Sequence, residues 1–353
     1  MNIQKISYQR FDIKLSEPYT IAYETISHAT NFILKIETDS TLVGYGCAAP
    51  DKVVTNETPE QVETTIKDII IPFLKGKNPF NYAKILADLK VLLKEKSSSL
   101  AMVDLAMHDL IAKKADVPLY LLLGGYRNSI ATSITIGILP MEETLKKATD
   151  FVKQGFSIIK IKGGLNINED IEKMMRLHEL FPKVKWRFDG NQGYSVEEAI
   201  KFVSATKNIG IEIFEQPSKV GSDELLGEIT EKVGLPVMAD ESLKTLRDVF
   251  RLAQNERIDM VNIKLQKVGG ILEGLHINSV AKSAKLEAMV GCIDECSLGI
   301  SAGLHFALSR PNIHYADLDG HLDMIDDPCK GMFQLKKGVL YPSKYPGLGK
   351  LKL

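Results

Sequence analysis

This sequence has no surplus of positive or negative charge. Its 353 residues include 44 Lys and Arg against 45 Asp and Glu, so the formal net charge is −1, and like charges form no conspicuous run. Proteins that bind nucleic acid or anionic membranes usually present a concentrated basic surface. We therefore expect neither nucleic acid nor a membrane among its partners.

Long hydrophobic runs are also missing. No stretch approaches the roughly 20 apolar residues of a membrane-spanning helix, and the N-terminus lacks the basic region and apolar core of a secretory signal. The four cysteines, at positions 47, 292, 296 and 329, are too few and too scattered for a disulfide framework in a chain of this length. These features predict a cytoplasmic protein, with Cys292 and Cys296 as reduced thiols of the core.

Two common functional signatures are absent as well. The seven histidines form no HExxH or other closely spaced set, which argues against a zinc hydrolase. Gly44 and Gly46 begin no dinucleotide-binding loop, because no helix follows them and a third glycine is missing.

The first 56 residues alternate apolar and polar side chains as the strands of an antiparallel sheet do, with a hairpin turn over 38–41. The segment 16–28 between the first two strands is too long and polar for a tight turn. We expect it to be a loop that is either disordered or covers something.

Helical patterns follow this sheet. Thr58 and Gln61 have the spacing of a capping box, with Pro59 at the first helical position. Further helices are expected over 82–93 and over 100–111, the latter with a single apolar stripe. A domain boundary is expected at about residue 125.

After that boundary, short apolar strands alternate with amphipathic helices, a pattern typical of βα units around a parallel sheet. Eight such strands favour a closed barrel over an open doubly wound sheet, which would need a glycine loop for phosphate. The expected strands are 131–137, 157–162, 185–189, 211–215, 236–240, 260–264, 287–291 and 313–317. The expected helices are 141–154, 167–180, 195–206, 245–254, 270–284 and 301–309.

Five charged residues close successive strands at a nearly constant spacing. They follow one another after 27, 26, 25 and 24 residues, in the order Lys162, Asp189, Glu215, Asp240 and Lys264. In a βα barrel the carboxyl ends of all strands open into one mouth. The five charges are therefore expected to meet there.

Three of these residues are carboxylates on adjacent strands, with no histidine or cysteine among them. An all-oxygen donor set suits a hard cation, and Mg²⁺ fits best because it keeps water or substrate oxygens in its remaining positions. Helix caps or solvated loop acids would explain each acid taken singly, but not three in register. One Mg²⁺ per subunit is expected.

Lys162 and Lys264 end the two strands that flank the strands of the three acids, and Lys160 precedes Lys162 on the same strand. Lys160 and Lys162 are on the same side of one strand, so repulsion between their ammonium groups is expected to lower the pKa of at least one. An edge strand with solvated lysines is the alternative. Lys264 should face Lys162 across whatever the metal holds, which suits moving a proton from one face of a carbon to the other. A divalent cation makes such a step feasible by stabilising the enediolate of a carboxylate substrate.

Several motifs occur together in this chain: Lys160-x-Lys162, Asp189-Gly-Asn191, Glu215-Gln-Pro217, Asp240-Glu-Ser242, Lys264 followed by Gly269-Gly270, and the run from Ala101 to Gly125. Jointly they resemble the enolase superfamily, in its muconate lactonizing enzyme subgroup, and most of all its dipeptide epimerases, such as the L-Ala-D/L-Glu epimerases. The resemblance extends over essentially the whole chain. A Lys or His base with magnesium is the known pairing at such sites.

The resemblance implies an α/β fold with three parts. Residues 126–324 would form a modified TIM barrel of the (β/α)7β type, and residues 1–125 an α+β capping domain. Residues 325–353 would return to the capping domain and complete it. The capping segments 16–28 and 47–56 would close the barrel mouth and read the substrate side chain. A homo-oligomer is also expected.

The resemblance implies an Mg²⁺-dependent epimerase that interconverts L,L- and L,D-dipeptides by proton transfer at the α-carbon of the C-terminal residue. Lys162 and Lys264 would be the two acid/base catalysts. The metal ligands would be Asp189, Glu215 and Asp240. Lys160 would lower the pKa of Lys162 and help to hold the substrate carboxylate. Two residues, Asn191 and Glu241, would support the metal ligands.

Asp317 and Asp319 lie two residues apart at the end of the last strand, where they can clasp one ammonium group. They resemble the site that receives the free α-amino group in dipeptide epimerases, and a simple turn is the alternative. Thr135, Cys292 and Asp294 are expected to line the same pocket.

One position departs from the family pattern. Epimerases specific for an acidic second residue resemble one another in carrying an arginine in the first capping loop, where this chain has Tyr23 and Glu24. A carboxylate at Glu24 would repel a glutamate side chain. We therefore expect a dipeptide whose second residue is not acidic, with a cationic residue as one option.

Other reactions use the same scaffold, namely those of lactonizing enzymes and other cycloisomerases, o-succinylbenzoate synthases and N-acylamino acid racemases. None of them needs an acidic clasp for an ammonium group, so Asp317 and Asp319 favour the dipeptide epimerase. A Schiff-base aldolase could use Lys162 but has no need of the three acids. A barrel that binds a metal or sugar without catalysis would leave the opposed lysines unexplained.

Overall fold

The computed structural model describes residues 1–22, 25–221, 223–254 and 256–352. The strands of this part of the chain are β1 (Ile3–Thr20), β2 (Thr25–Thr38), β3 (Val43–Ala48), β4 (Ile130–Ala131), β5 (Ile134–Ile136), β6 (Ile158–Lys162), β7 (Lys185–Asp189), β8 (Ile211–Glu215), β9 (Val237–Ala239), β10 (Met260–Lys264), β11 (Glu287–Gly291), β12 (Ile313–Asp317), β13 (Phe333–Lys336) and β14 (Val339–Pro342).

The helices are α1 (Pro59–Thr65), α2 (Ile71–Leu74), α3 (Tyr82–Leu93), α4 (Ser97–Lys114), α5 (Leu119–Leu122), α6 (Met141–Lys153), α7 (Ile167–Leu180), α8 (Val196–Thr206), α9 (Asp223–Lys232), α10 (Leu246–Ala253), α11 (Leu265–Val268), α12 (Ile271–Ser283) and α13 (Ser297–Ala307). A π-helical turn, η1 (Ile66–Ile70), joins α1 to α2, and a 3-10 turn, η2 (Pro79–Asn81), precedes α3.

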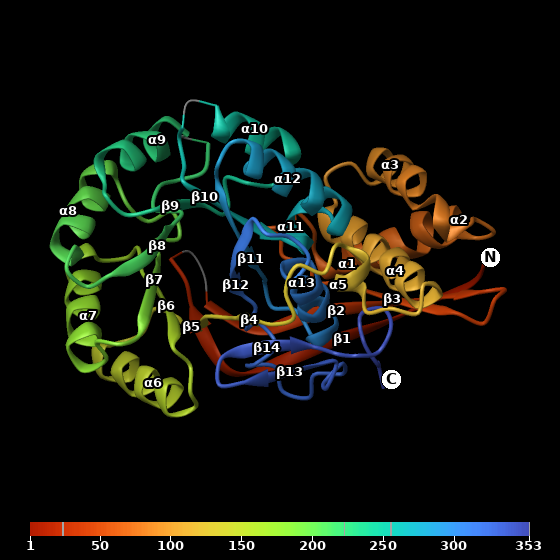
Figure 1. The fold of residues 1–353 in the computed structure, drawn as a ribbon, viewed down its shortest axis with the longest axis horizontal. Coiled ribbons are helices and arrows are strands. Elements are labelled where there is room, and N and C mark those ends of the chain that lie inside the picture. The colour runs from red at the N-terminus through yellow and green to blue at the C-terminus, as the bar shows by residue number, and fades with distance from the viewer. Residues whose placement is uncertain (23–24, 222, 255, 353) are drawn as a thin grey trace.

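Strands β5 to β12 form one parallel sheet in chain order. Thr132, just before β5, forms a parallel bridge with Ala316 of β12, and the amide of Ser133 donates to the Ala316 carbonyl at 3.1 Å. The first and last strands therefore meet, and the sheet closes into a barrel with its helices outside (Figure 1). The expected α/β barrel with a separate small antiparallel sheet is confirmed.

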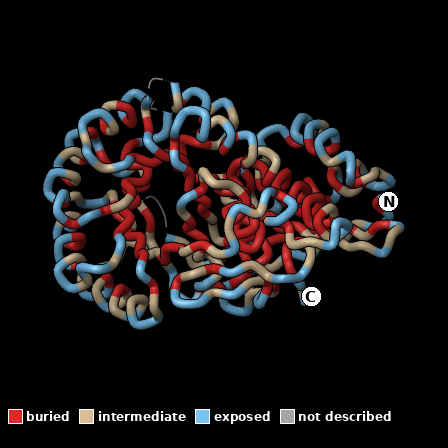
Figure 2. The backbone as a smooth tube through the Cα atoms, viewed as in Figure 1, coloured by how far each residue is buried: buried red, intermediate tan, exposed pale blue. Residues whose placement is uncertain are grey.

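Strands β1, β2 and β3 form the antiparallel sheet, and β3 packs on α4. A Cβ atom at Gly46 would lie 1.9 Å from the carbonyl oxygen of Met102, so only glycine lets the strand approach this closely. Helix α4 has 14 buried residues among its 18, and it lies in the strongly buried region of Figure 2. Leu100, Val103, Met107 and Leu110 of the expected apolar stripe are buried in one cluster, and burial extends beyond the stripe because α4 is covered from several sides.

Residues 16–20 and 25–28 belong to strands rather than to an irregular loop, contrary to expectation. β1 and β2 continue as a paired ladder as far as Thr20 and Thr25, with a register shift between Lys14 and Tyr19. The amide of Ser16 also donates to the carbonyl of Asp323 at 2.7 Å. Backbone pairing on both sides thus extends strands whose polar residues suggested a loop. Tyr23 and Glu24 lie outside the described residues.

Other differences concern boundaries. The strand expected over 131–137 is divided into β4 and β5, α13 begins at Ser297 rather than at residue 301, and α9 was not expected. β14 pairs with β4, and Gly347 forms a bridge with Pro118 before α5. The division of the chain at residues 125 and 325 stays a prediction.

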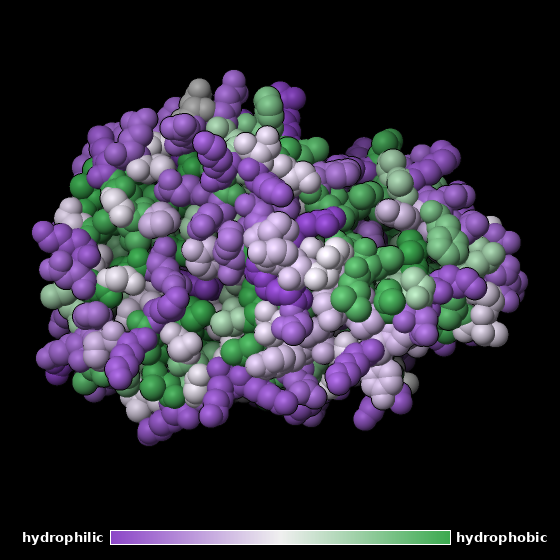
Figure 3. Space-filling model, viewed as in Figure 1, coloured by the Kyte–Doolittle hydropathy of each residue, from purple (hydrophilic) through white to green (hydrophobic). Residues whose placement is uncertain are grey.

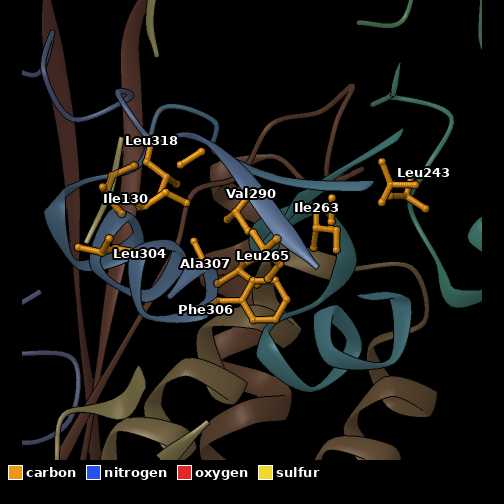
Figure 4. Close-up of a cluster of buried hydrophobic side chains, with 14 of the residues drawn as sticks. Ile130, Leu243, Ile263, Leu265, Val290, Leu304, Phe306, Ala307 and Leu318 are labelled. Carbon is orange, nitrogen blue, oxygen red and sulfur yellow. The ribbon is translucent and has the colours of Figure 1, made fainter. Parts of the chain in front are cut away.

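A large hydrophobic core fills the space between barrel strands and helices. Val290 of β11 and Ile263 of β10 lie with Leu265, Phe306 and Ala307 in this core (Figure 4), and all five are at most 2% exposed. Such packing fixes the strands, and with them the side chains at the strand ends.

The outer surface is mixed. Hydrophilic residues cover most of the face in Figure 3, with hydrophobic residues gathered over the region of α4 and α5. Within the described ranges, no helix is long and apolar enough to cross a membrane.

Candidate active site

The sheet geometry decides which side chains enter the barrel mouth. Side chains repeat on one face at every second residue, and Ile213 and Met238 belong to a small buried cluster of their own. Glu215 and Asp240, two residues further along, continue these rows at the carboxyl ends of the strands. The same face therefore changes from apolar to acidic where the mouth opens.

A pocket opens at this end of the barrel and brings most of the expected residues together. Its lining includes Thr135, Lys160, Lys162, Asn191, Asp240, Glu241, Lys264, Cys292, Asp294, Asp317 and Asp319. Asp189 and Glu215 are not in the lining, since they are 1% exposed and Lys160 lies against them.

Lys160 is the centre of an ion-pair network. Its Nζ lies 3.2 Å from Asp189, 2.8 Å from Glu215 and 2.9 Å from Asp317. Burial lowers the pKa of Lys160, but the three carboxylates raise it by more, so the pKa stays well above its usual value. Burial also lowers the pKa of Lys264, and Asp240 raises it by more. The lowering expected for at least one of Lys160 and Lys162 therefore does not occur at Lys160.

Lys162 is held beside the first acid. Its Nζ lies 3.3 Å from Asp189 Oδ2 and 3.2 Å from Asn191 Oδ1. The loop that follows packs tightly, because a Cβ at Gly164, which has φ +104°, would lie 2.2 Å from the Gly190 carbonyl oxygen. Glycine at this position lets the loops after β6 and β7 touch, and the contact keeps Lys162 next to Asp189.

The two lysines contact opposite ends of the row of acids. In the strand order, β7, β8 and β9 lie between β6 and β10. Lys162 on β6 contacts Asp189, whereas the Nζ of Lys264 on β10 lies 2.7 Å from Asp240 Oδ2. The amines thus approach the three carboxylates from two sides.

The three acids suit a hard divalent cation in their donor chemistry. Burial raises the pKa of Glu215 to about 8, Lys160 opposes the shift, and the Asp189 and Asp240 carboxylates add to it. Burial and Asp240 likewise raise the pKa of Glu241 to about 7. Its Oε2 is buried with no hydrogen-bond partner among the described residues. A cation would offset this crowding of negative charge, and Asp189, Glu215 and Asp240 would hold it.

Asp317 and Asp319 are positioned by the first barrel strand. Asp317 Oδ1 accepts a hydrogen bond from Ser133 Oγ at 2.6 Å, and Asp319 Oδ2 accepts one from the Thr135 amide at 2.6 Å. Burial raises the pKa of Asp317, but Lys160 lowers it to about 2. Burial and then Asp317 raise the pKa of Asp319 to about 7. One carboxylate is therefore charged, and the second gains charge most easily when a cation is near.

An acidic rim borders the pocket, which we define as Glu17, Asp51, Asp294 and Asp323. Glu17 lies on β1 and Asp51 follows β3, whereas Asp294 and Asp323 lie in the segments after β11 and β12. Glu17 pairs with Lys147 at 2.6 Å, and Asp294 Oδ2 accepts a hydrogen bond from Tyr19 at 2.9 Å. Lys147 balances only one of these four acids, so the outer part of the pocket carries net negative charge. Glu24 cannot be added to it, since it lies outside the described residues.

Comparison with known proteins gives the family. Residues 5–124 match the N-terminal domain of the mandelate racemase/muconate lactonizing enzyme family, and residues 143–350 match the enolase C-terminal domain-like family. The chain belongs to the enolase superfamily. An L-Lys-D/L-Arg epimerase of Desulforapulum autotrophicum is 41% identical to it over 351 residues, which cover 99% of each chain.

Two solved structures resemble this superfamily member over its full length. The dipeptide epimerase of Enterococcus faecalis, complexed with Mg and L-Leu-L-Tyr, has a TM-score of 0.97 at 37% identity and covers 100% of both chains. That of Methylococcus capsulatus, complexed with Mg and L-Arg-D-Lys, has a TM-score of 0.95 at 34% identity and also covers 100% of both. The resemblance recognised in the sequence is confirmed.

Sequence reasoning missed one residue of this superfamily member's site. Lys267 on α11 is 1% exposed, and its Nζ donates to Asp240 Oδ1 at 2.5 Å and to the Asn262 carbonyl at 3.1 Å. It therefore holds the Asp240 carboxylate from behind. The available signal was a second lysine three residues after Lys264, in the short segment Leu265–Val268.

Proposed function

We propose that this chain is a magnesium-dependent dipeptide epimerase that inverts the α-carbon of a dipeptide's C-terminal residue. The observation that carries the proposal is that Lys162 and Lys264 line one pocket and contact opposite ends of a row of three buried carboxylates. The names of its relatives support it, since they are dipeptide epimerases and include complexes with Mg and a dipeptide.

Bound Mg²⁺ would offset the negative charge that develops on the substrate carboxylate during deprotonation. Lys162 and Lys264 would exchange roles, one removing the α-proton from one face while the other delivers a proton to the opposite face. Lys160 would hold the substrate carboxylate, and Asn191 and Glu241 would keep the metal ligands in place. Thr135 and Cys292 would border the dipeptide.

Incubation of dipeptides with enzyme and Mg²⁺ in heavy water tests the reaction. Each turnover should replace the α-proton of the C-terminal residue with deuterium and invert that centre, which mass spectrometry and chiral chromatography detect. Turnover of N-acylated amino acids with no turnover of any dipeptide would point instead to an N-acylamino acid racemase.

Asp319 should give the reaction a specific pH dependence. Its pKa is raised to about 7, and only its ionised form attracts the substrate's ammonium group. We therefore expect kcat/KM to fall as the pH drops below about 7, approaching tenfold per pH unit. Asp319→Asn should have a lower kcat/KM and lack this limb. A limb retained in Asp319→Asn would point to Glu241, whose pKa is also raised to about 7.

The acidic rim favours a cationic side chain at the second residue of the dipeptide. Kinetics across a panel should give a higher kcat/KM for dipeptides ending in Lys or Arg than for those ending in Glu. Asp323→Asn should lower kcat/KM for cationic dipeptides by up to about fivefold, the effect of about 1 kcal/mol for a solvent-exposed pair, and leave neutral ones unchanged. The control is Asp88→Asn, which also removes one negative charge but lies on α3, away from the pocket lining. A preference for L-Ala-L-Glu would contradict the assignment.

We also propose that the protein forms a homo-oligomer and is located in the cytoplasm. Exposed Leu121 and Leu122 of α5 would suit burial between copies, and four unpaired cysteines suit a reducing compartment. Light scattering of the purified protein and cell fractionation are their tests.

A further inference from the structure

Three thiols meet in the core away from the catalytic lysines. Cys47 lies on β3, Cys296 directly precedes α13, and Cys329 lies between β12 and β13. The Sγ of Cys296 is 3.6 Å from that of Cys47 and 3.8 Å from that of Cys329. All three cysteines are free and at most 1% exposed.

A carboxylate joins two of these thiols. Within the described ranges, the sulfur atoms of Cys296 and Cys329 and a carboxylate oxygen of Asp327 all lie within 4.8 Å of one another. Asp327 Oδ2 accepts from the Ser297 amide at 3.0 Å, and Oδ1 accepts from the Cys329 amide at 2.9 Å. Oδ2 also accepts a hydrogen bond from Ser297 Oγ. These bonds fix the carboxylate, and Oδ1, which accepts only the Cys329 amide among the described residues, keeps a lone pair that can face an ion.

The spacing of the sulfurs matches that around a tetrahedral ion. Zinc–sulfur bonds of about 2.3 Å in a tetrahedron separate the sulfurs by about 3.8 Å, and the Cys296–Cys329 separation is 3.8 Å. Thiolates select soft or borderline cations over Mg²⁺. We propose that Cys296, Cys329 and Asp327 form a second metal site, for a thiophilic cation such as Zn²⁺, with Cys47 adjoining it.

A cavity gives this site a route to solvent, and Ser297, His321 and Asp327 line it. The Nδ1 atom of His321 is buried and has no hydrogen-bond partner among the residues that the structure describes. His321 is not one of the residues whose donor atoms lie within 4.8 Å of one another, so water or another small ligand from the cavity would complete the coordination of an ion held by Cys296, Cys329 and Asp327.

An ion at this site would join three parts of the chain and lie close to the catalytic pocket. Asn31 on β2 accepts a hydrogen bond from the Cys296 amide at 2.9 Å and donates to the carbonyl of Asp294 at 3.0 Å. Asp294 lines the catalytic pocket. The second metal would therefore act as a clamp on the loop between β11 and α13, without touching substrate.

Cobalt titration of the full-length protein tests the proposal, because Co²⁺ bound by thiolate has a near-ultraviolet charge-transfer band that carboxylate ligands do not give. With reductant and excess Mg²⁺ present, the band should saturate at one Co²⁺ per chain, and Zn²⁺ should remove it. Cys296→Ser and Cys329→Ser should each abolish the band. Cys292→Ser, which removes a thiol outside the cluster, and Asp240→Asn, which alters the catalytic site, should retain it.

Asp327→Asn offers a milder change should a cysteine variant fail to fold, and it should weaken Co²⁺ binding at least tenfold. Absence of the band in folded wild-type protein would overturn the proposal. So would a band that persists in the Cys296→Ser, Cys329→Ser double variant. A disulfide between Cys296 and Cys329 in protein purified under reductant, found by thiol counting, would overturn it as well.

Discussion

Lys162→Ala and Lys264→Ala should each abolish epimerisation while leaving α-proton exchange with one stereoisomer. The two amines contact Asp189 and Asp240 at opposite ends of the acid row, so each is expected to serve one face of the α-carbon. Without Lys162, Lys264 can still remove and return the proton on its own face. Epimerisation should fall by roughly 10²- to 10⁴-fold, the usual effect of a general acid/base.

Deuterium exchange followed separately for the L,L- and L,D-dipeptides measures this effect. The two variants should show opposite stereoisomer preferences. Lys153→Ala, at an exposed position of α6, should behave as wild type, and thermal unfolding should confirm that all variants are folded. Equal loss of exchange with both stereoisomers in both variants would mean that the lysines do not divide the two faces.

Removal of divalent cations with a chelator should abolish exchange for every dipeptide, and Mg²⁺ should restore it. The α-proton of a carboxylate is too weakly acidic for an amine base unless the developing charge is offset. In the protein, Asp189, Glu215 and Asp240 are each at most 3% exposed. Their mutual repulsion disfavours the charged state that a cation would stabilise.

Asp189→Asn, Glu215→Gln and Asp240→Asn should each raise the Mg²⁺ concentration for half-maximal exchange by at least about tenfold, since even residues that only support metal ligands cost 10- to 100-fold. Titration calorimetry with Mg²⁺ gives the same information without turnover. Asp88→Asn should leave both measurements unchanged. Full exchange after chelation, or an unaltered Mg²⁺ requirement in Asp240→Asn, would remove the metal from the mechanism.

Strand positions could be predicted well from the sequence. The expected strands 185–189, 211–215, 260–264, 287–291 and 313–317 coincide with the observed ones. Each contains apolar residues and ends in a charged residue or glycine. The even spacing of the five charges likewise reflects one βα unit per charge.

Long-range pairing could not be predicted. The extension of β1 to Thr20 and of β2 back to Thr25 depends partly on the contact between Ser16 and Asp323, which are 307 residues apart. A local pattern of polar residues contains no information about such a partner. The same reason explains why the apolar stripe over 100–111 did not reveal that the rest of the chain covers most of α4.

The electrostatics of the lysines also depended on distant residues. Considered alone, Lys160 and Lys162 repel each other on one strand, yet in the fold Lys160 meets Asp189, Glu215 and Asp317 from three other strands. Coulomb energy depends on distance in space, so the direction of a pKa shift follows only from the assembled site.

By itself, the sequence determined the periodic signals of this protein: the alternation of strands and helices, the charges at strand ends, and therefore the superfamily and its class of chemistry. Only the tertiary structure decided what occupies the space around those charges. It brought Lys267 behind Asp240, gathered the acidic rim, and placed the sulfur atoms of Cys47 and Cys329 each within 4 Å of that of Cys296. Local patterns arise from neighbours along the chain, whereas burial, charge pairing and metal geometry arise between segments that meet only after folding.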